Sequence, residues 1–153
     1  MIKKLFSASR WSHDSTDWVS LILRLSLGGL MLNHGVPKFL KLIHGDFEFG
    51  DPIGLGVKTS LVMAVFAEFL CSILLALGLY TRLTIIPLAF TMSVAVFVVH
   101  QDDPFSRKEN ALLFLLPYVA LFLLGSGRYS LDAMLFKRNR DLLAEQKNKD
   151  KIV

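Results

Sequence analysis

The sequence lacks most of the features that mark metalloproteins, flavoproteins and secreted proteins. Its one cysteine, Cys71, can form no intrachain disulfide and makes no metal motif by itself. No HxxH or ExxH spacing supports a metal centre, and no flavin, haem or iron–sulfur motif is present. The first residues carry basic side chains but no continuous apolar run, which argues against a cleavable signal peptide. We therefore expect no metal and no cofactor in the chain itself.

The basic residues are also not arranged as they are in nucleic-acid-binding proteins. The net charge is +4, yet no basic stripe interleaved with aromatic side chains occurs. The sequence has instead long apolar runs, with 53% hydrophobic residues and a mean hydropathy of +0.49. Its charged residues are segregated into loops and tails. This pattern predicts an integral membrane protein of one domain, with the lipid bilayer as a partner and no nucleic acid.

The apolar runs predict an all-α fold, a four-transmembrane-helix bundle with short amphipathic interfacial helices at both termini. The four spans are expected at about residues 18–39, 58–82, 83–99 and 110–124. Together they make a transmembrane domain over residues 18–128. An amphipathic segment, residues 1–17, precedes this domain, and an amphipathic helix with a tail, residues 129–153, follows it. Ser130 is a candidate N-cap for that last helix.

One long loop interrupts this plan. Residues 43–57 contain four glycines and a proline among acidic side chains, which is typical of turns. A long loop in a compact domain is often functional. We expect its Phe47 and Phe49 to fold back onto the mouth of the bundle.

A single carboxylate lies within the second span. Between Ser60 and Tyr80 every side chain except that of Glu68 is apolar or small and neutral. At about 1.5 Å rise per residue this run crosses the roughly 30 Å of a bilayer's hydrocarbon, so Glu68 lies near its middle. An unpaired charge at that depth costs at least about 2.5 kcal/mol. Glu68 therefore requires a partner inside the protein.

The first span offers such a partner on one helical face. At 100° per residue, a narrow stripe contains Ser20, Arg24, Gly28, Met31, Gly35 and Lys38. Small residues on such a stripe let helices pack closely in a membrane. From its height in the span, Arg24 is expected to reach Glu68. The two can form a structural ion pair that fixes helix register, or Glu68 can be a proton-handling group, and the sequence leaves both open.

A second polar group is expected near the other face of the membrane. His34 and His100 come out at similar heights in their spans, with Lys38, Glu109 and Asn110 close by. Two imidazoles, a carboxylate and an ammonium from three helices can form a site for a polar headgroup. The alternative is a solvated mouth of the bundle, where polar side chains cost nothing.

The distribution of lysine and arginine predicts the orientation. With four spans both termini lie on one side of the membrane. That side would carry eleven basic residues, namely Lys3, Lys4, Arg10, Arg82, Arg128, Lys137, Arg138, Arg140, Lys147, Lys149 and Lys151. The other side would carry five, namely Lys38, Lys41, Lys58, Arg107 and Lys108. The positive-inside rule therefore predicts that both termini are cytoplasmic.

Several stretches, taken together and in order, resemble the DoxX family of small four-helix membrane proteins. They are LRLSLGGLMLNHGVPKF (23–39), DPIGLG (51–56), AEFLCSILLALGLYTRL (67–83), VVHQDDPF (98–105), ENALLFLLP (109–117) and GSGRYSLD (125–132). Ser126 departs from the GPG expected there. The polar positions that recur in the family map onto Arg24, His34, Gly35, Lys38, Glu68, His100 and Glu109.

The resemblance implies a bacterial inner-membrane protein of a family described as oxidoreductases. The family takes its name from a small subunit of quinone-linked respiratory and thiosulfate-oxidising complexes. We therefore expect a quinone-interacting component of a membrane oxidoreductase or redox-stress system, with quinone and other oxidoreductase subunits as partners. The candidate catalytic residues are Glu68, His34 and His100, and the candidate ligand-binding residues are Arg24, Lys38, Glu109 and Asn110.

The roles expected in this hypothesis follow from the side-chain chemistry. His34, Lys38 and His100 would donate hydrogen bonds to a quinone headgroup, and Glu68 and Glu109 would handle protons. With no redox cofactor motif in the chain, electrons would come from a partner or pass between bound molecules. The competing hypothesis is a protein without enzymatic activity. It would be a scaffold or assembly subunit, or a small-solute carrier, whose buried charges only hold helices together.

Overall fold

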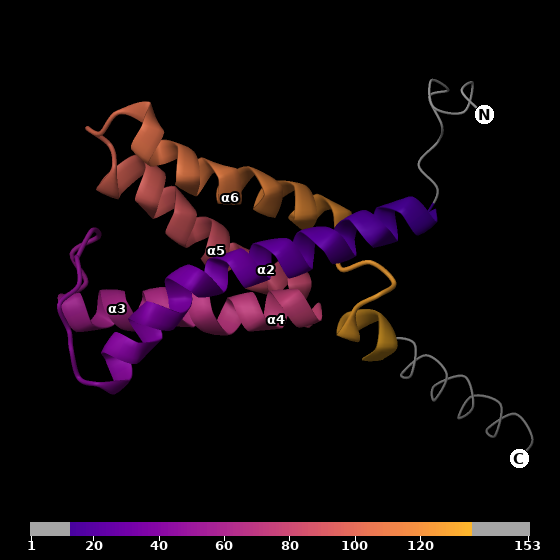
Figure 1. Ribbon diagram of the computed structural model, residues 1–153, viewed down its shortest axis with the longest axis horizontal. Coiled ribbons are helices and arrows are strands. Elements are labelled where there is room, and N and C mark those ends of the chain that lie inside the picture. Colours follow the sequence, from indigo (N-terminus) through magenta and orange to yellow (C-terminus); the bar gives the residue numbers. More distant parts are fainter. Residues whose placement is uncertain (1–12, 136–153) are drawn as a thin grey trace, which may run out of the picture.

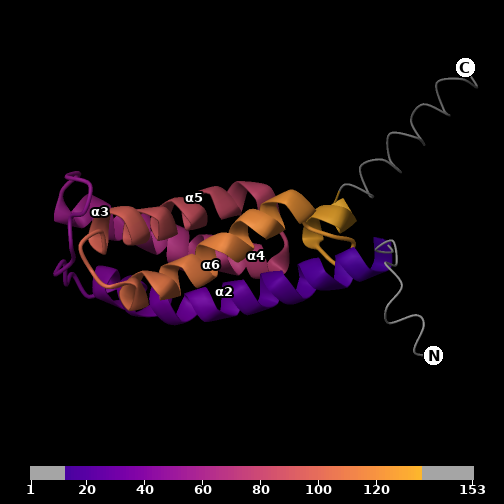
Figure 2. The same ribbon diagram turned by 90° about the horizontal axis from the view of Figure 1, so that it is seen from above.

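The computed structural model describes residues 13–135, which contain helices and no strand. The elements are α2 (His13–Ile43), α3 (Val57–Val65), the π-helical segment η1 (Phe66–Cys71), α4 (Ser72–Leu77), α5 (Thr81–Val94), the π-helical segment η2 (Ala95–Val99) and α6 (Phe105–Leu124). Because α3, η1 and α4 are continuous, as are α5 and η2, the elements form four rods. α2 runs the length of the molecule, with the α5–α6 hairpin on one side and the α3–α4 rod on the other (Figure 1). The view in Figure 2 shows the same four rods lying side by side.

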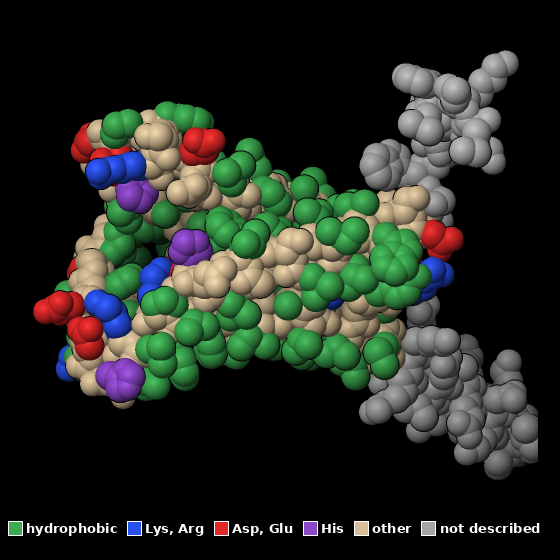
Figure 3. Space-filling view, in the orientation of Figure 1, with side chains coloured by type: hydrophobic (Ala, Val, Ile, Leu, Met, Phe, Trp, Pro, Cys, Tyr) green, Lys and Arg blue, Asp and Glu red, His purple; other side chains and the backbone are tan. Residues whose placement is uncertain are grey.

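Three of these rods are long and apolar enough to cross a membrane, among the residues that the structure describes. They are Asp14–Ile43, Val57–Leu77 and Thr81–Val99, which confirms the first three expected spans in outline. α6 has a suitable length, but Arg107, Lys108 and Glu109 lie in its first turns. The fourth span therefore stays a prediction. Figure 3 shows charged side chains gathered towards the two ends of the molecule and apolar side chains between them.

The expected terminal helices fall mostly outside the described residues. This holds for residues 1–12 of the N-terminal amphipathic segment and for residues 136–153 of the C-terminal one. Residues 131–135 are helical, and the backbone N–H of Ala133 donates to Ser130 Oγ at 3.1 Å. Ser130 is thus the N-cap that the sequence predicts.

The predicted polar stripe of α2 is the face that this helix buries. Ser20, Arg24 and Met31 are at most 1% exposed. A Cβ on Gly28 would lie 2.8 Å from the carbonyl oxygen of Ser72, closer than real Cβ contacts come. Glycine here therefore lets α2 approach the backbone of the α3–α4 rod. The matching stripe of that rod, which includes Glu68 and Ser72, is buried as well.

The predicted ion pair between Arg24 and Glu68 is wrong. Arg24 Nη2 donates to the carbonyl oxygen of Tyr129 at 2.6 Å, and Nη1 to that of Ala76 at 3.5 Å. The height of Arg24 was compatible with either direction, and its long side chain turns away from Glu68. Carbonyl groups at the end of a helix have no partner within it, so a buried guanidinium with several donors is stabilised there.

We call the end of the bundle that contains residues 78–80 and 125–130 the turn end, and the end that contains residues 44–56 and 100–104 the loop end. At the turn end the chain after α6 fastens the other rods. Ser20 Oγ donates to the carbonyl oxygen of Gly125 at 2.7 Å. The carboxylate of Asp132 accepts from the N–H groups of Tyr80 and Thr81 at 2.8 and 3.1 Å, which caps α5. The turn end is therefore closed by hydrogen bonds between rods.

Candidate functional site

The partner of Glu68 is Lys38, from the same stripe of α2. Lys38 Nζ donates to both carboxylate oxygens of Glu68. The side chain of Glu68 is 2% exposed and that of Lys38 is 27% exposed. The pair therefore neutralises the intramembrane charge from within the protein, as its cost requires, while the ammonium keeps an open side.

Local backbone geometry brings the two side chains together. A Cβ on Gly35 would lie only 2.4 Å from the carbonyl oxygen of Glu68, so glycine is needed for α2 to touch this part of η1. One turn further along, the rings of Phe39 and Phe69 stack with centroids 4.4 Å apart and an interplanar angle of 4°. Lys38 lies between these two contacts in the sequence. The close approach and the stacked rings hold its Cα beside η1.

Glu68 belongs to a π-helical turn, a form that often occurs at functional sites. The segment η1 covers Phe66–Cys71, and a second such segment, η2, covers Ala95–Val99. Side chains of both segments, including Glu68 and Ala95, line the same cavity. The two irregular turns therefore face one space.

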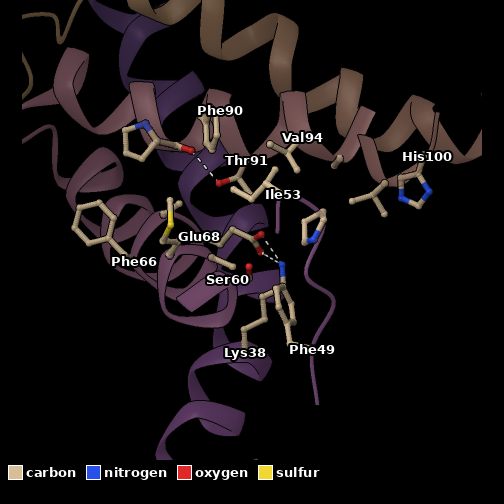
Figure 4. A pocket seen from close by; sticks show the side chains of 17 residues that line it. Lys38, Phe49, Ile53, Ser60, Phe66, Glu68, Phe90, Thr91, Val94 and His100 are labelled. Carbon is tan, nitrogen blue, oxygen red and sulfur yellow. Dashed lines mark hydrogen bonds and ion pairs between the residues drawn. The ribbon is translucent and has the colours of Figure 1, made fainter. Parts of the chain in front are cut away.

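This space, which we call the apolar cavity, has a volume of about 410 Å³. Met63 and Phe66 line it from one rod, Phe90 and Val94 from another, and Phe49 from the long loop. Lys38 and Glu68 supply the charged part of its wall (Figure 4). Phe49 lies with its ring centroid 5.7 Å from Lys38 Nζ, which confirms that this loop residue folds back onto the bundle.

A second space, the polar cavity, has a volume of about 280 Å³ and lies among α2, α5 and α6. His34, Arg107 and Asn110 line it, and none of them lines the apolar cavity. Lys38, Glu68, Thr91, Ala95 and His100 line both cavities. The ion pair is therefore part of a wall that the two cavities share. Figure 3 shows a hollow towards the loop end with histidine and basic side chains at its rim.

His100 is held at this junction by a carboxylate of the loop that follows it. Its Nδ1 lies 2.8 Å from Asp103 Oδ2, and Arg107 Nη1 lies 3.2 Å from Asp103 Oδ1. The hydrogen bond from His100, followed by the positive charge of Arg107, lowers the pKa of Asp103. An ionised carboxylate only accepts hydrogen bonds, so Nδ1 carries the proton and Nε2 remains free to accept one.

The structure brings together most of the predicted site residues, but not all. His34, Lys38, His100 and Asn110 of the predicted cluster line the polar cavity, and Glu68 lines it as well. His34 lies with its ring edge-on to Phe114, at a centroid distance of 5.9 Å. Glu109 is exposed and lines neither cavity, and Arg24 lies at the turn end.

The apolar wall of the cavity could hardly be recognised from the amino-acid pattern. Phe90, Thr91 and Val94 line the cavity from α5, and the hydroxyl of Thr91 donates to the carbonyl oxygen of Pro87 at 2.9 Å. Apolar residues at these positions look like any lipid-facing surface of a span. The one usable signal was the pair of phenylalanines in a loop rich in turn residues. Among the described residues, no three or more His, Cys, Asp or Glu side chains are grouped as metal ligands.

Comparisons with known proteins agree with this architecture. The DoxX family model matches residues 19–101, which include Lys38, Glu68 and His100. An uncharacterized protein of Haemophilus influenzae is 32% identical over 127 residues, covering 76% of this chain and 90% of the relative. No solved structure matches. The chain, a helical protein with several rods able to cross a membrane, therefore belongs to the DoxX family.

Proposed function

We propose that the protein binds a lipid-soluble quinone in the apolar cavity, with the quinone headgroup at Lys38 and Glu68. It would serve as a quinone-interacting component of a membrane oxidoreductase or redox-stress system in the bacterial inner membrane. The observation that carries the proposal is a single charged pair in the wall of an otherwise mostly apolar cavity. Binding sites for small molecules commonly combine an apolar wall with a few placed polar groups.

The size and chemistry of the cavity support a quinone. A volume of about 410 Å³ falls within the usual range for ligand sites, roughly 300–1,000 Å³. A quinone headgroup has two carbonyl acceptors, and the ammonium of Lys38 has three donors, of which Glu68 does not use all. The carboxylate of Glu68 can accept from the hydroxyl of a quinol. The pair can therefore contact both the oxidised and the reduced form.

The rim of the cavity supports entry from the membrane. Phe66 and Phe90 lie on opposite sides of it, and their side chains are 52% and 50% exposed. Both belong to rods that can cross a membrane, so an opening between them faces lipid. A quinone dissolved in the bilayer would reach the ion pair without passing through water. Its isoprenoid tail could remain between these rings.

In this proposal fewer of the predicted site residues contact the quinone headgroup than the sequence analysis expected. Lys38 and Glu68 would contact the headgroup, and His100 would lie at its far side. His34 and Asn110 belong to the polar cavity alone, and Arg24 and Glu109 lie apart from both cavities. The electrons would come from another membrane oxidoreductase subunit or pass between bound molecules.

Binding of a short-chain quinone to the purified protein tests the proposal, measured by intrinsic fluorescence or calorimetry. Removing one donor should weaken binding by roughly 1–3 kcal/mol, about five- to a hundredfold, so Lys38→Gln should bind more weakly. Lys41→Gln is a matched control, because Lys41 lies one turn away and contacts Asp46 and Glu48 of the loop instead. Thermal melts check that both variants fold.

The competing function without enzymatic activity makes the opposite prediction. If the wild-type protein binds no quinone, or if Lys38→Gln and Lys41→Gln bind it equally, the ion pair serves only to hold α2 against η1. A scaffold or assembly subunit, or a small-solute carrier, would then be the better interpretation.

The proposal includes a four-span topology with both termini in the cytoplasm. This rests on the basic residues predicted at the two faces and on the position of residues 13 and 135 at one end of the molecule (Figure 1). A reporter fused after Val153 should be active only in its cytoplasmic form. A reporter inserted near Glu48 should be active only in its periplasmic form. The reverse pattern would place the loop end in the cytoplasm.

A further inference from the structure

The two cavities that meet at Lys38 and Glu68 differ in their walls and in where they lead. The apolar cavity opens between rods whose exposed side chains, such as Met63 and Phe66, are apolar. The polar cavity reaches towards the loop end, where Arg107, with a side chain 68% exposed, and Asn110 form part of its wall. The Lys38–Glu68 ion pair thus borders both an apolar cavity and a polar one.

We propose that these are two separate routes to one site, a lipid route for the quinone and a water route for protons. This inference rests on the proposed function and adds to it the path by which protons are exchanged. The route runs from the loop end through the polar cavity, past His100 and His34, to the oxygens of Glu68.

The polar cavity has the size and the groups that such a route requires. At roughly 30 Å³ per water molecule, about 280 Å³ holds several waters. Waters persist in a cavity when polar partners line it, and here the imidazoles, the amide of Asn110 and the guanidinium of Arg107 can serve. The apolar cavity shares His100 with it but lacks His34, Asn110 and Arg107. Water therefore enters the site from the polar side.

The charged and titratable groups around Glu68 suit proton exchange. Lys38 faces it from α2, His100 lies at the end of η2, and Tyr118 of α6 is close enough to interact electrostatically with it. His100 lines the polar cavity and has its Nδ1 on Asp103, which leaves Nε2 available as a proton acceptor.

The proposed exchange consists of proton transfers alone and requires no electron donor. The O–H bond of a bound quinol hydroxyl breaks, and its proton forms a new O–H bond with a carboxylate oxygen of Glu68. Glu68 then passes this proton through water to Nε2 of His100, and from there it leaves to bulk water at the loop end. The reverse order delivers a proton to the headgroup. No electron moves in these steps.

Two carbodiimides of different solubility test whether Glu68 has two routes. Dicyclohexylcarbodiimide dissolves in lipid, whereas ethyl-dimethylaminopropyl-carbodiimide is charged and stays in water. Either reagent activates a carboxyl group, which then becomes an N-acylurea or, beside an amine, an amide with release of a urea. Products at Glu68, including a Lys38–Glu68 amide, are measured by peptide mass spectrometry on the full chain in liposomes permeable to the charged reagent.

We expect both reagents to modify Glu68 in the wild-type protein, and two variants to separate the routes. His34→Leu combined with Asn110→Leu removes two polar groups that line only the polar cavity, and should slow the water-soluble reagent at least tenfold while changing the lipid-soluble one less than twofold. Val94→Phe, which fills only the apolar cavity, should do the reverse. The exposed Asp102 is an internal control and should react with the water-soluble reagent at the same rate in all proteins.

The inference is overturned if the water-soluble reagent does not modify Glu68, or if the His34→Leu and Asn110→Leu protein reacts with it as the wild type does. These outcomes are independent of the quinone titration. A protein that binds quinone but fails the carbodiimide test keeps the proposed function and loses the water route. A protein with both routes and no quinone binding loses the proposed function instead.

Discussion

The two cations on the stripe that α2 turns towards the bundle have opposite surroundings. Arg24 is fully buried at the turn end, with Gly78 so close that a Cβ there would lie 1.8 Å from Nη1. It donates to the backbone carbonyls of Ala76 and Tyr129. Lys38, about four turns along the same stripe, has one carboxylate partner and two cavities beside it. The Arg24 guanidinium is thus enclosed by backbone groups, whereas the Lys38 ammonium borders open cavities.

This difference separates a structural charge from a charge that is able to bind. A guanidinium that donates to fixed carbonyls has no partner to exchange, so it holds helix ends together. An ammonium paired with one flexible carboxylate can shift one of its donors to a ligand that enters the cavity. Sequence alone ranks the two residues as equals, since both are cations on the same buried stripe.

The largest expected effect comes from removing the enclosed charge. Arg24→Met leaves two backbone carbonyls without their donor, and hydrogen bonds to charged groups contribute about 1.5–3 kcal/mol each. We expect a loss of about 3–5 kcal/mol in the free energy of unfolding, measured by thermal or denaturant unfolding in detergent. Arg82→Met is the matched control, because Arg82 is exposed, and should change stability by less than about 0.5 kcal/mol. If Arg24→Met and Arg82→Met reduce stability equally, Arg24 is not the structural charge described above.

The second largest effect is expected from breaking the Lys38–Glu68 ion pair. Breaking a fully buried pair costs about 3–5 kcal/mol, and the partial exposure of Lys38 reduces this to about 2–3 kcal/mol for Lys38→Met or Glu68→Met. The double variant Lys38→Met/Glu68→Met should lose less than the sum of the two, because it leaves no unpaired charge. A double-mutant cycle of unfolding free energies measures this. Strictly additive losses would mean that the ion pair is not formed in the membrane protein.

A smaller effect is expected where α2 touches η1. Gly35→Ala places a methyl group against the backbone of Glu68, and such overpacking costs about 1–3 kcal/mol. It should also weaken quinone binding, because Lys38 moves away from the cavity. Gly29→Ala is the control, since no atom lies within 4 Å of a Cβ there, and it should be neutral or stabilising by up to about 1 kcal/mol. If Gly35→Ala leaves both stability and quinone binding unchanged, α2 does not approach the backbone of Glu68 closely.

The smallest effect concerns the loop that lies over the apolar cavity. Hydrogen bonds from Ser60 and from the N–H of Gly56 lower the pKa of Asp51. A carboxylate with a lowered folded-state pKa stabilises the fold above its unfolded pKa and ceases to do so as the pH falls through the folded value. Protection of the Leu55 and Gly56 amides from hydrogen exchange should therefore fall below about pH 4. Asp51→Asn should remove this pH dependence, whereas Asp102→Asn should leave it unchanged.

The buried faces could be predicted because helical periodicity decides them. Ser20, Arg24 and Gly28 recur at helical spacing, and a polar or small stripe in an apolar span must face protein. The partner of Arg24 could not be predicted, since a long side chain reaches in either direction and nothing in the sequence shows where free carbonyls lie. The prediction for Glu68 was right in requiring a partner and wrong in choosing it.

The cavities were beyond prediction for a different reason. Their walls include residues of two π-helical turns, each of which alters the spacing of side chains that a regular helix would give. The residues of η1 and η2 are ordinary apolar ones apart from Glu68, and no residue type marks where such a turn begins. Of the predicted cluster, His34, Lys38, His100 and Asn110 line the polar cavity, whereas Glu109 does not.

The π-helical turn η1 also limits how the length of this chain can change. Gly35 rests on the backbone of Glu68 within this turn, whereas Gly28 rests on Ser72 and Ala76 beyond its end. Deleting any one of residues 69–71 would turn one of these contacts about 100° away from α2. Substitutions in this segment can be absorbed one side chain at a time, but a single-residue deletion cannot. Because Gly35 must contact Glu68 and Gly28 must contact Ser72, the number of residues between Glu68 and Ser72 is constrained. This constraint does not depend on which residues they are.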